Sequence, residues 1–292
     1  MNLFEPERTQ FDLNFNVFNI AIRVHPFFWL TTILLGSSIL QDPDLDPPVR
    51  FGYLFVWIAV CFVSILVHEM GHVVVGRYYG ADGHIVLAGL FGLAIGSGDV
   101  PTRGQRIAVS FAGPGAQFLL IGVVLGGIAI FEPAPVLRMG ERLMRLEFPY
   151  FYAPDWPEWL NFLMLQLVWI NLLWALVNLL PIWTLDGGKI SRELFEHFTR
   201  ANGVRWSLIL SLVTAGTIAV NGLISWLMKA PLIPLLGVGS GFTVLFFGLF
   251  AYGSWQALQQ ARYGGGGGRH RLEDESYERA PWERDADWWK RG

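Results

Sequence analysis

The residues best suited to chemistry are His68, Glu69 and His72, which lie near the end of a long apolar stretch. Residues four apart lie on one face of a helix, so both histidines can point at one metal ion. Imidazole suits Zn²⁺, and a catalytic zinc site uses three protein ligands and keeps the fourth position for water. Glu69 lies one residue further round the helix and can hold that water. The spacing therefore predicts a zinc site that still needs a third ligand.

The alternative for this pattern is a pair of structural histidines buried in a core beside an exposed glutamate. Residues 51–67, directly before the pattern, carry no charge and offer no solvated face. An ionisable cluster at the end of an apolar span is costly and is by default a functional site. We therefore favour the metal site over the structural alternative.

The composition is typical of a membrane protein. Of the 292 residues, 53% are hydrophobic and only 15% are charged, whereas soluble domains carry about 25% charged residues. Mean hydropathy is +0.41, and the formal net charge of −3 gives no reason to expect nucleic-acid binding. The single cysteine, Cys61, lies inside an apolar run, which argues against a disulfide framework and a thiolate zinc cluster. The N-terminal residues are polar and charged, so no signal peptide is expected.

The apolar runs predict an all-α polytopic membrane protein with about six transmembrane helices. The expected spans are residues 24–40, 52–79, 107–131, 159–180, 206–228 and 234–258. Residues 1–23 form an N-terminal arm, 24–262 the membrane domain and 263–292 a flexible, charged tail connected through a glycine run. His25 opens the first span beside a proline, and we expect this histidine to be structural.

Residues 80–105 are rich in glycine and do not form a convincing helix. Two short apolar segments, 85–87 and 93–95, are typical of strands. Such a β-hairpin or re-entrant segment between the second and third spans either pairs with an extended substrate by strand addition or only connects the spans, and the sequence leaves both open. In the third span, Gly113-Pro114-Gly115 predicts a kink or a break, because proline removes a helical hydrogen bond.

A carboxylate follows the fourth span at a sharp turn. Pro181 ends the helix, and two glycines come directly after Asp186. Taken alone, Asp186 is best explained as the N-cap of the amphipathic helix that follows. Because the two histidines lack a third ligand, Asp186 at the broken span becomes the best candidate for that role.

Lysine and arginine are distributed unequally between the two sides of the membrane. With six spans, one side holds 16 of the 21 Lys and Arg residues, and the positive-inside rule assigns this side to the cytoplasm. Both termini are then cytoplasmic in a multi-pass protein of the cell (inner) membrane. His72 and Asp186 are both placed toward this side, so the two halves of the expected site converge.

The motifs together resemble those of the site-2 protease family of intramembrane zinc metalloproteases. The similarity covers about residues 52–188. It rests on His68-Glu69-x-x-His72, on Ala112-Gly113-Pro114 and on Asn178-x-x-Pro181-x-x-x-Leu185-Asp186-Gly187-Gly188. The chain departs from the family pattern at Gln117, where asparagine is usual, and at Trp183-Thr184, where a proline-rich pair is common.

The resemblance implies a role for each motif residue. His68, His72 and Asp186 would bind one Zn²⁺, and Glu69 would be the catalytic base of a zinc metalloendopeptidase. The residues that would position the substrate are Asn178, Gly113, Pro114 and Gln117.

The implied substrate is a single-pass transmembrane protein, cleaved in or near its membrane segment after local unwinding of the helix. The lipid bilayer is the other expected partner, and the charged tail is a candidate binding segment for a cytoplasmic protein. The alternative is a non-catalytic membrane zinc-binding scaffold or metal carrier, which needs neither Glu69 nor the Asn178 motif. A third function, a membrane-tethered processor of soluble or prenylated chains, usually takes its third ligand from a different pattern.

The charge distribution generates a prediction about orientation. A reporter that works only in the cytoplasm should be active when it is fused after Arg262, because the basic tail is expected on that side. Activity measured in whole cells checks this. A signal at the same position from a reporter that works only outside the cytoplasm would overturn the orientation.

Overall fold

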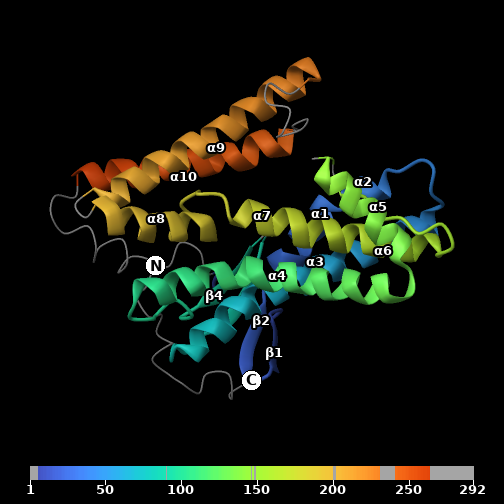
Figure 1. The fold of residues 1–292 in the computed structure, drawn as a ribbon, viewed down its shortest axis with the longest axis horizontal. Coiled ribbons are helices and arrows are strands. Elements are labelled where there is room, and N and C mark those ends of the chain that lie inside the picture. Colours follow the sequence, from blue (N-terminus) through green and yellow to red (C-terminus); the bar gives the residue numbers. More distant parts are fainter. Residues whose placement is uncertain are drawn as a thin grey trace. The chain divides into compact units, whose positions relative to one another are not determined.

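The computed structural model describes residues 6–89, 91–145, 147, 149–199, 202–230 and 241–263. The described chain divides into two compact units. The first unit comprises residues 6–101 and 112–175, and the second comprises 102–111 and 176–263. Each unit is described by itself below, and Figure 1 labels their elements.

The chain begins with strands and continues almost entirely as helices. The first elements are β1 (Leu13–Val17), β2 (Ile20–Val24), α1 (Pro26–Leu35), α2 (Ser37–Leu40), α3 (Pro47–Tyr78), β3 (His84–Ala88) and β4 (Phe91–Ile95). The following helices are α4 (Arg103–Phe131), α5 (Pro133–Met144), α6 (Glu158–Trp169), the π-helical turn η1 (Ile170–Trp174) and α7 (Ala175–Asn178). The last three are α8 (Asp186–Thr199), α9 (Gly203–Met228) and α10 (Gly241–Tyr263).

Five helices of the described chain are long and apolar enough to cross a membrane, which confirms a multi-pass membrane protein. They are α3, α4, the continuous segment Glu158–Asn178, α9 and the Gly241–Ala261 part of α10. The first expected span, 24–40, is instead split into α1 and the four-residue α2. Helix α1 has 10 residues and is about 15 Å long, half of the hydrocarbon thickness. The expected count of six spans is therefore not confirmed.

The first unit contains a four-stranded sheet with the order β1-β2-β3-β4. Strands β3 and β4 are antiparallel and confirm the hairpin expected between residues 85 and 95. Strands β1 and β2 form a second hairpin, which pairs with β3 through a parallel contact between β2 and β3. Residues 1–23 were expected to form an arm, and these strands were not identified from the sequence. Because of this pairing, the arm lies beside the segment that follows α3.

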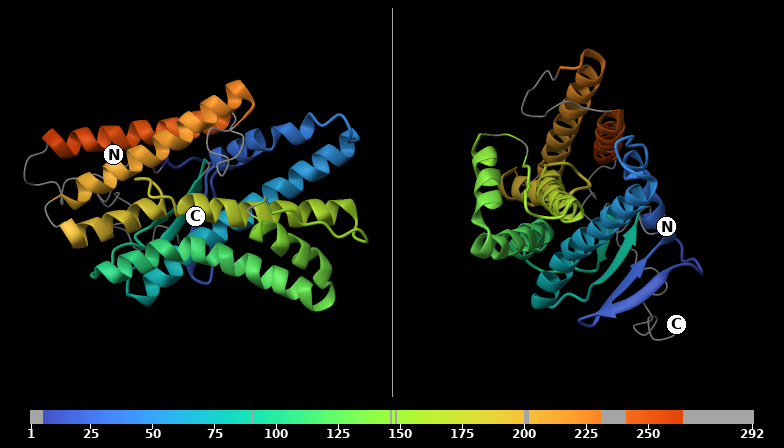
Figure 2. Two further views of the ribbon diagram at one scale, coloured as in Figure 1. Left: turned by 45° about the horizontal axis from the view of Figure 1, so that its top comes forward. Right: turned by 90° about the vertical axis from the view of Figure 1, so that its right-hand side faces the viewer.

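One face of the sheet packs against α3 and α1 (Figure 2). The buried side chains at this contact are Ile20, Ile22, Val24, Phe28, Ile65, Val73, Ile85 and Leu87. Burying an aliphatic or aromatic side chain of this size stabilises a fold by about 1.5–3 kcal/mol. The part of α3 that carries the HExxH residues is thus fixed to the sheet rather than to lipid alone.

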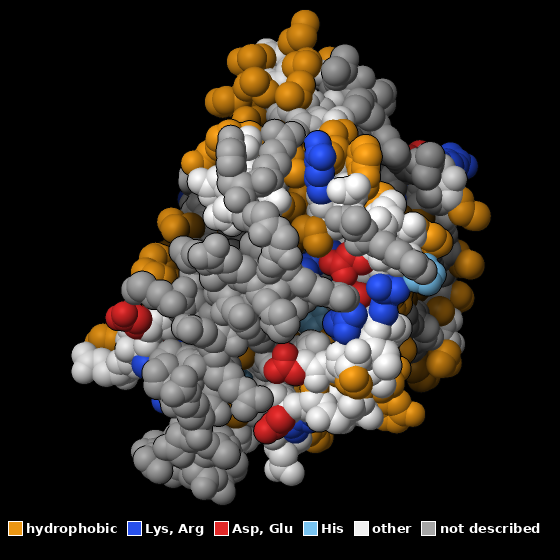
Figure 3. Space-filling view, turned by 90° about the vertical axis from the view of Figure 1, so that its left-hand side faces the viewer, with side chains coloured by type: hydrophobic (Ala, Val, Ile, Leu, Met, Phe, Trp, Pro, Cys, Tyr) orange, Lys and Arg blue, Asp and Glu red, His pale blue; other side chains and the backbone are white. Residues whose placement is uncertain are grey.

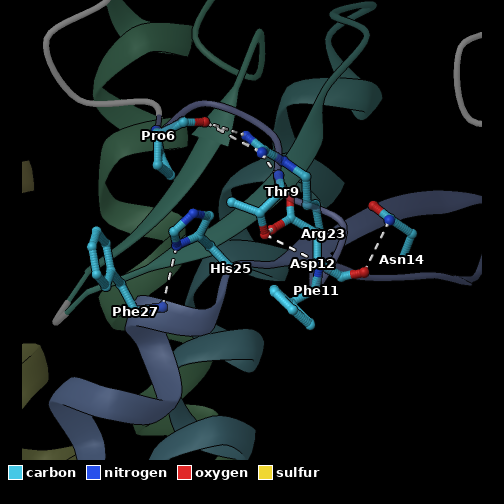
Figure 4. Close-up of polar contacts among 8 residues, drawn as sticks. All are labelled: Pro6, Thr9, Phe11, Asp12, Asn14, Arg23, His25 and Phe27. Atoms are coloured by element: carbon cyan, nitrogen blue, oxygen red, sulfur yellow. Dashed lines mark hydrogen bonds and ion pairs between the residues drawn. The ribbon is translucent and has the colours of Figure 1, made fainter.

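Polar contacts join the N-terminal segment to β2 (Figure 4). The Arg23 guanidinium lies 3.0 Å from the Asp12 carboxylate, and both side chains are almost fully buried. Burial raises the pKa of Asp12, but hydrogen bonds from Thr9 and Arg23 together lower that pKa below its usual range. His25 caps α1, because its Nδ1 atom accepts a hydrogen bond of 3.2 Å from the Phe27 amide. The expected structural role of His25 is confirmed.

Helix α4 runs without a break from Arg103 to Phe131, with Pro114 inside it. The break considered at Gly113-Pro114-Gly115 is therefore absent. Neighbouring helices can satisfy the backbone group that proline leaves free in a membrane span. The glycines at this position serve close approach to α3, as the metal site shows.

In the second unit, α9 and α10 pack along each other (Figure 1). Ser211 Oγ lies 2.6 Å from Ser254 Oγ across this contact. Charged side chains of both signs lie among hydrophobic ones in the view of Figure 3. Among the ion pairs of this unit, Glu193 contacts Arg103 and Arg106, and Arg192 contacts Glu196.

The half-buried histidine of β3, His84, generates a prediction about pH. The pKa of His84 is lowered to about 4, mainly by burial and then by the charges of Arg23 and Arg8. Between pH 6.5 and 4 the unfolded chain, whose histidine has a pKa of about 6.5, binds more protons than the folded chain does. The free energy of unfolding of the sheet should therefore fall by at most about 3 kcal/mol as pH falls through this window. Hydrogen exchange of the strands should show this loss, and His84→Leu should remove it. A sheet equally protected at pH 6.5 and 4 would contradict the prediction.

Candidate metal site

Helix α3 brings the two predicted histidine ligands together. His68 Nε2 and His72 Nε2 are 3.1 Å apart, and both side chains are buried. Two nitrogens that each bind a tetrahedral zinc ion at 2.0–2.1 Å are about 3.3 Å apart. The histidine pair therefore has the spacing of two ligands of one ion.

The other ring nitrogen of His68 has a buried partner. His68 Nδ1 lies 2.9 Å from Gln117 Oε1, and Gln117 on α4 is fully buried. An amide oxygen only accepts hydrogen bonds, so His68 Nδ1 carries the proton and the lone pair of Nε2 is left for a metal. Such a partner fixes the tautomer and the orientation of a metal-binding histidine. The sequence placed Gln117 among the substrate-positioning residues and did not predict this contact.

Glycine at position 113 leaves room beside both histidines. A β-carbon on Gly113 would lie 2.7 Å from His68 Nε2 and would overlap His72 Nε2. On α3, a β-carbon on Gly71, directly before His72, would lie 2.9 Å from the carbonyl carbon of Ala112. The Ala112-Gly113-Pro114 motif therefore brings the α4 backbone against the metal-binding face of α3. Only residues without a side chain allow this approach.

Glu69 lies against the hairpin. Its side chain is buried, and a β-carbon on Gly92 of β4 would lie 2.5 Å from Glu69 Oε1. The β4 backbone thus covers the carboxylate, and glycine at position 92 makes room for it. The hairpin therefore packs against Glu69, a contact that the sequence did not predict.

Asp186 belongs to the second unit, where it is the first residue of α8. It is buried and accepts a hydrogen bond of 3.0 Å from Lys189 Nζ. The glycines after it are required by packing. A β-carbon on Gly187 would overlap the Leu179 carbonyl, and one on Gly188 would overlap the Ile182 carbonyl. The Asp-Gly-Gly sequence therefore lets the loop fold tightly onto the start of α8.

The loop that carries Asp186 is held from both ends within the second unit. Asn178 ends α7 and is buried. The Trp183 amide donates a hydrogen bond of 2.7 Å to Ser211 Oγ of α9, and the Trp183 ring lies 5.9 Å from the Arg192 guanidinium. Trp183, one of the two departures from the family pattern, thus anchors the loop to α9 and α8.

Comparison with known proteins gives a consistent result. Residues 56–219 match the sequence profile of peptidase family M50. A candidate zinc metalloprotease from Synechocystis sp. is 27% identical over 256 residues, which are 84% of this chain and 57% of that protein. A zinc metalloprotease from Methanocaldococcus jannaschii is 27% identical over 216 residues, which are 71% of this chain and 54% of that protein. The chain thus spans about half the length of these relatives.

A solved structure is also similar. It is that of a site-2 protease from Methanocaldococcus jannaschii, with 21% sequence identity and a TM-score of 0.48. The match covers 84% of this chain and 94% of that chain.

The glycine beside the histidines generates a prediction. Gly113→Ala should abolish metal binding, because the added methyl group would take the space next to both Nε2 atoms. Gly122→Ala is the matched control, since it lies on the same helix and a β-carbon there would meet no atom within 4 Å. Metal content of the purified variants checks the effect. Wild-type metal content in Gly113→Ala would contradict the geometry described for this site.

Proposed function

The chain belongs to peptidase family M50, and from this premise we propose that it is a zinc metalloprotease that hydrolyses peptide bonds in or near transmembrane segments of membrane proteins. The observation that carries the proposal is the buried pair of histidines in a membrane-spanning helix, with Nε2 atoms 3.1 Å apart. Glu69, between them in sequence, is the base. Family membership agrees with the resemblance of the motifs to site-2 proteases.

The metal is zinc, and its proposed ligands are His68, His72 and Asp186. The two imidazoles have the spacing of zinc ligands, and the Gln117 contact frees the correct nitrogen of His68. The support for Asp186 is its burial, its place at the start of α8 and its position in the Leu185-Asp186-Gly187-Gly188 motif. When bound, zinc polarises the scissile carbonyl and makes water acidic enough to lose a proton near neutral pH.

In the proposed mechanism, a Glu69 carboxylate oxygen takes a proton from the attacking water and later gives a proton to the leaving amine. The hydroxyl adds to the carbonyl carbon, and the carbon–nitrogen bond breaks. The β4 backbone beside Glu69 holds the carboxylate in place. His68 and His72 are held by the packing of α3 against the sheet and against α4.

Strand β4 is the proposed platform for the substrate. It stands at one end of the sheet order and lies against Glu69. The substrate is a single-pass transmembrane helix, which must unwind before its peptide bond can be attacked. An extended substrate segment that adds alongside β4 would have its backbone next to the base. Asn178, Gly113 and Pro114 are proposed to position the same segment.

We propose that the protein lies in the inner membrane, and the charge distribution favours an orientation with both termini in the cytoplasm. The pairing of β2 with β3 supports one part of this proposal, namely that the N-terminal arm and the segment after α3 lie on the same side of the membrane. The charged tail, 263–292, lies outside the described residues and is proposed to bind a cytoplasmic partner. A zinc scaffold or carrier would need no carboxylate placed as Glu69 is.

Two substitutions separate the enzyme from a scaffold. Glu69→Gln should keep the zinc and abolish cleavage, because the attacking water loses its base. Asp186→Ala should lose both zinc affinity and activity, because two imidazoles alone hold the ion poorly. Glu196→Ala is the control, since it removes a half-buried carboxylate that lies on the same helix and pairs with Arg192. Zinc content and cleavage of a helical substrate in detergent check the three variants.

The opposite result for either variant would contradict one part of the proposal. Cleavage by Glu69→Gln would exclude Glu69 as the base. A zinc-loaded, active Asp186→Ala protein would exclude Asp186 as the third ligand and would leave it as a helix cap, whose loss costs only about 1 kcal/mol of stability.

A further inference from the structure

Asn171 is a fully buried polar residue in a membrane-spanning helix. It lies in η1, the π-helical turn between α6 and α7. Its side-chain amide nitrogen donates to Ser64 Oγ of α3 at 2.8 Å and to the Leu167 carbonyl at 2.9 Å. Single π-helical turns are rare and are found frequently at functional sites. The contact with Ser64 therefore needs an explanation beyond packing.

Ser64 is one helical turn before His68 on the same helix. Its carbonyl oxygen accepts a hydrogen bond of 3.5 Å from Gln117 Nε2, while Gln117 Oε1 lies 2.9 Å from His68 Nδ1. The Gln117 amide therefore has its nitrogen toward Ser64 and its oxygen toward the histidine. Asn171 therefore contacts the hydroxyl of Ser64, Gln117 contacts the backbone carbonyl of the same residue, and Gln117 continues to the ring of His68.

The side chain of Asn171 is not optimised for stability. Its Oδ1 atom is buried and has no hydrogen-bond partner among the described residues. A buried acceptor without a partner is unfavourable, and leucine, which branches at the same carbon, would not carry this cost. The amide is therefore retained for what its nitrogen donates, which is the contact with Ser64 and the Leu167 carbonyl.

We propose that Asn171 and Ser64 are positioning residues of the metal site. Asn171 fixes this turn of α3 through the Ser64 hydroxyl, the Ser64 carbonyl in the same turn accepts from the Gln117 amide, and Gln117 holds His68 with the proton on Nδ1. This inference rests on the proposed function only in taking His68 and His72 as metal ligands. Outer hydrogen-bond partners of this kind typically change metal affinity by about 10–100-fold.

The experiment measures the zinc dissociation constant of the purified full-length chain in detergent, by competition with a chromogenic chelator. Asn171→Leu and Ser64→Ala should each weaken zinc binding by about 10-fold or more. Ser64→Thr should bind zinc almost as the wild type does, because it keeps the hydroxyl. The double variant Asn171→Leu/Ser64→Ala should bind zinc no more weakly than the single variant with the lower zinc affinity, because both substitutions remove the same hydrogen bond between Asn171 and Ser64.

Asn161 provides the matched control. It is also buried on α6, but it hydrogen-bonds the Ala153 amide and carbonyl and the Trp156 carbonyl. Asn161→Leu should lower the thermal stability and leave the zinc dissociation constant unchanged. The visible spectrum of Co²⁺-loaded protein gives a second readout, because a reoriented His68 should shift the absorption bands of Asn171→Leu and not those of Asn161→Leu.

The outcomes distinguish the two levels of the proposal. A wild-type chain that binds no zinc overturns the proposed function. Wild-type zinc affinity in Asn171→Leu, additive losses in the double variant, or an equal loss in Asn161→Leu would overturn only this inference. If Asn171→Leu does not fold, the comparison of Ser64→Ala with Ser64→Thr decides, and equal zinc affinities of these two variants would overturn it.

Discussion

The site depends on the burial of ionisable groups at the end of a membrane-spanning helix. A buried imidazole or carboxylate without partners is costly, so the surrounding elements must satisfy it. Gln117 does so for His68, and the β4 backbone covers Glu69. Glycine at positions 71, 92 and 113 allows this, because any side chain there would overlap a neighbouring element. The burial of ionisable groups thus accounts both for the chemistry of the site and for the close packing of glycines around it.

Much of the fold follows from apolar runs, but its first forty residues do not. The run 24–40 is barely long enough to span, and the structure divides it at Gly36, where a β-carbon would lie 2.5 Å from Trp57. This close contact with α3 is tertiary, so periodicity cannot reveal it. Strand β1 was recognisable, because Leu13-Asn14-Phe15-Asn16-Val17 alternates apolar and polar residues. Its partner β2 is buried apart from one residue, so the apolar–polar alternation of a half-buried strand is missing there.

The parts of the site that lie close together in the sequence were predicted, and the contacts between residues far apart in the sequence were not. His68, Glu69 and His72 follow from helical spacing alone, and the hairpin follows from glycine-punctuated apolar segments. The contact of Gln117 with His68 joins residues 49 apart, and that of Asn171 with Ser64 joins residues 107 apart. Such pairs depend on which faces of two helices meet, and no single-sequence pattern encodes this. The assignment of Asp186 as a ligand came from its motif and stays a prediction.

The parallel pairing of β2 with β3 has a consequence for synthesis. These strands are separated by about sixty residues, which include all of α3. At translation rates of roughly 5–20 residues per second, the N-terminal hairpin waits several seconds for β3 to emerge. During that time its open edge must be kept from other chains, and α3 must cross the bilayer before the sheet can close. The sheet that covers the carboxylate of Glu69 is therefore completed only once β3 and β4 have been synthesised, so Glu69 lacks this cover in every shorter nascent chain.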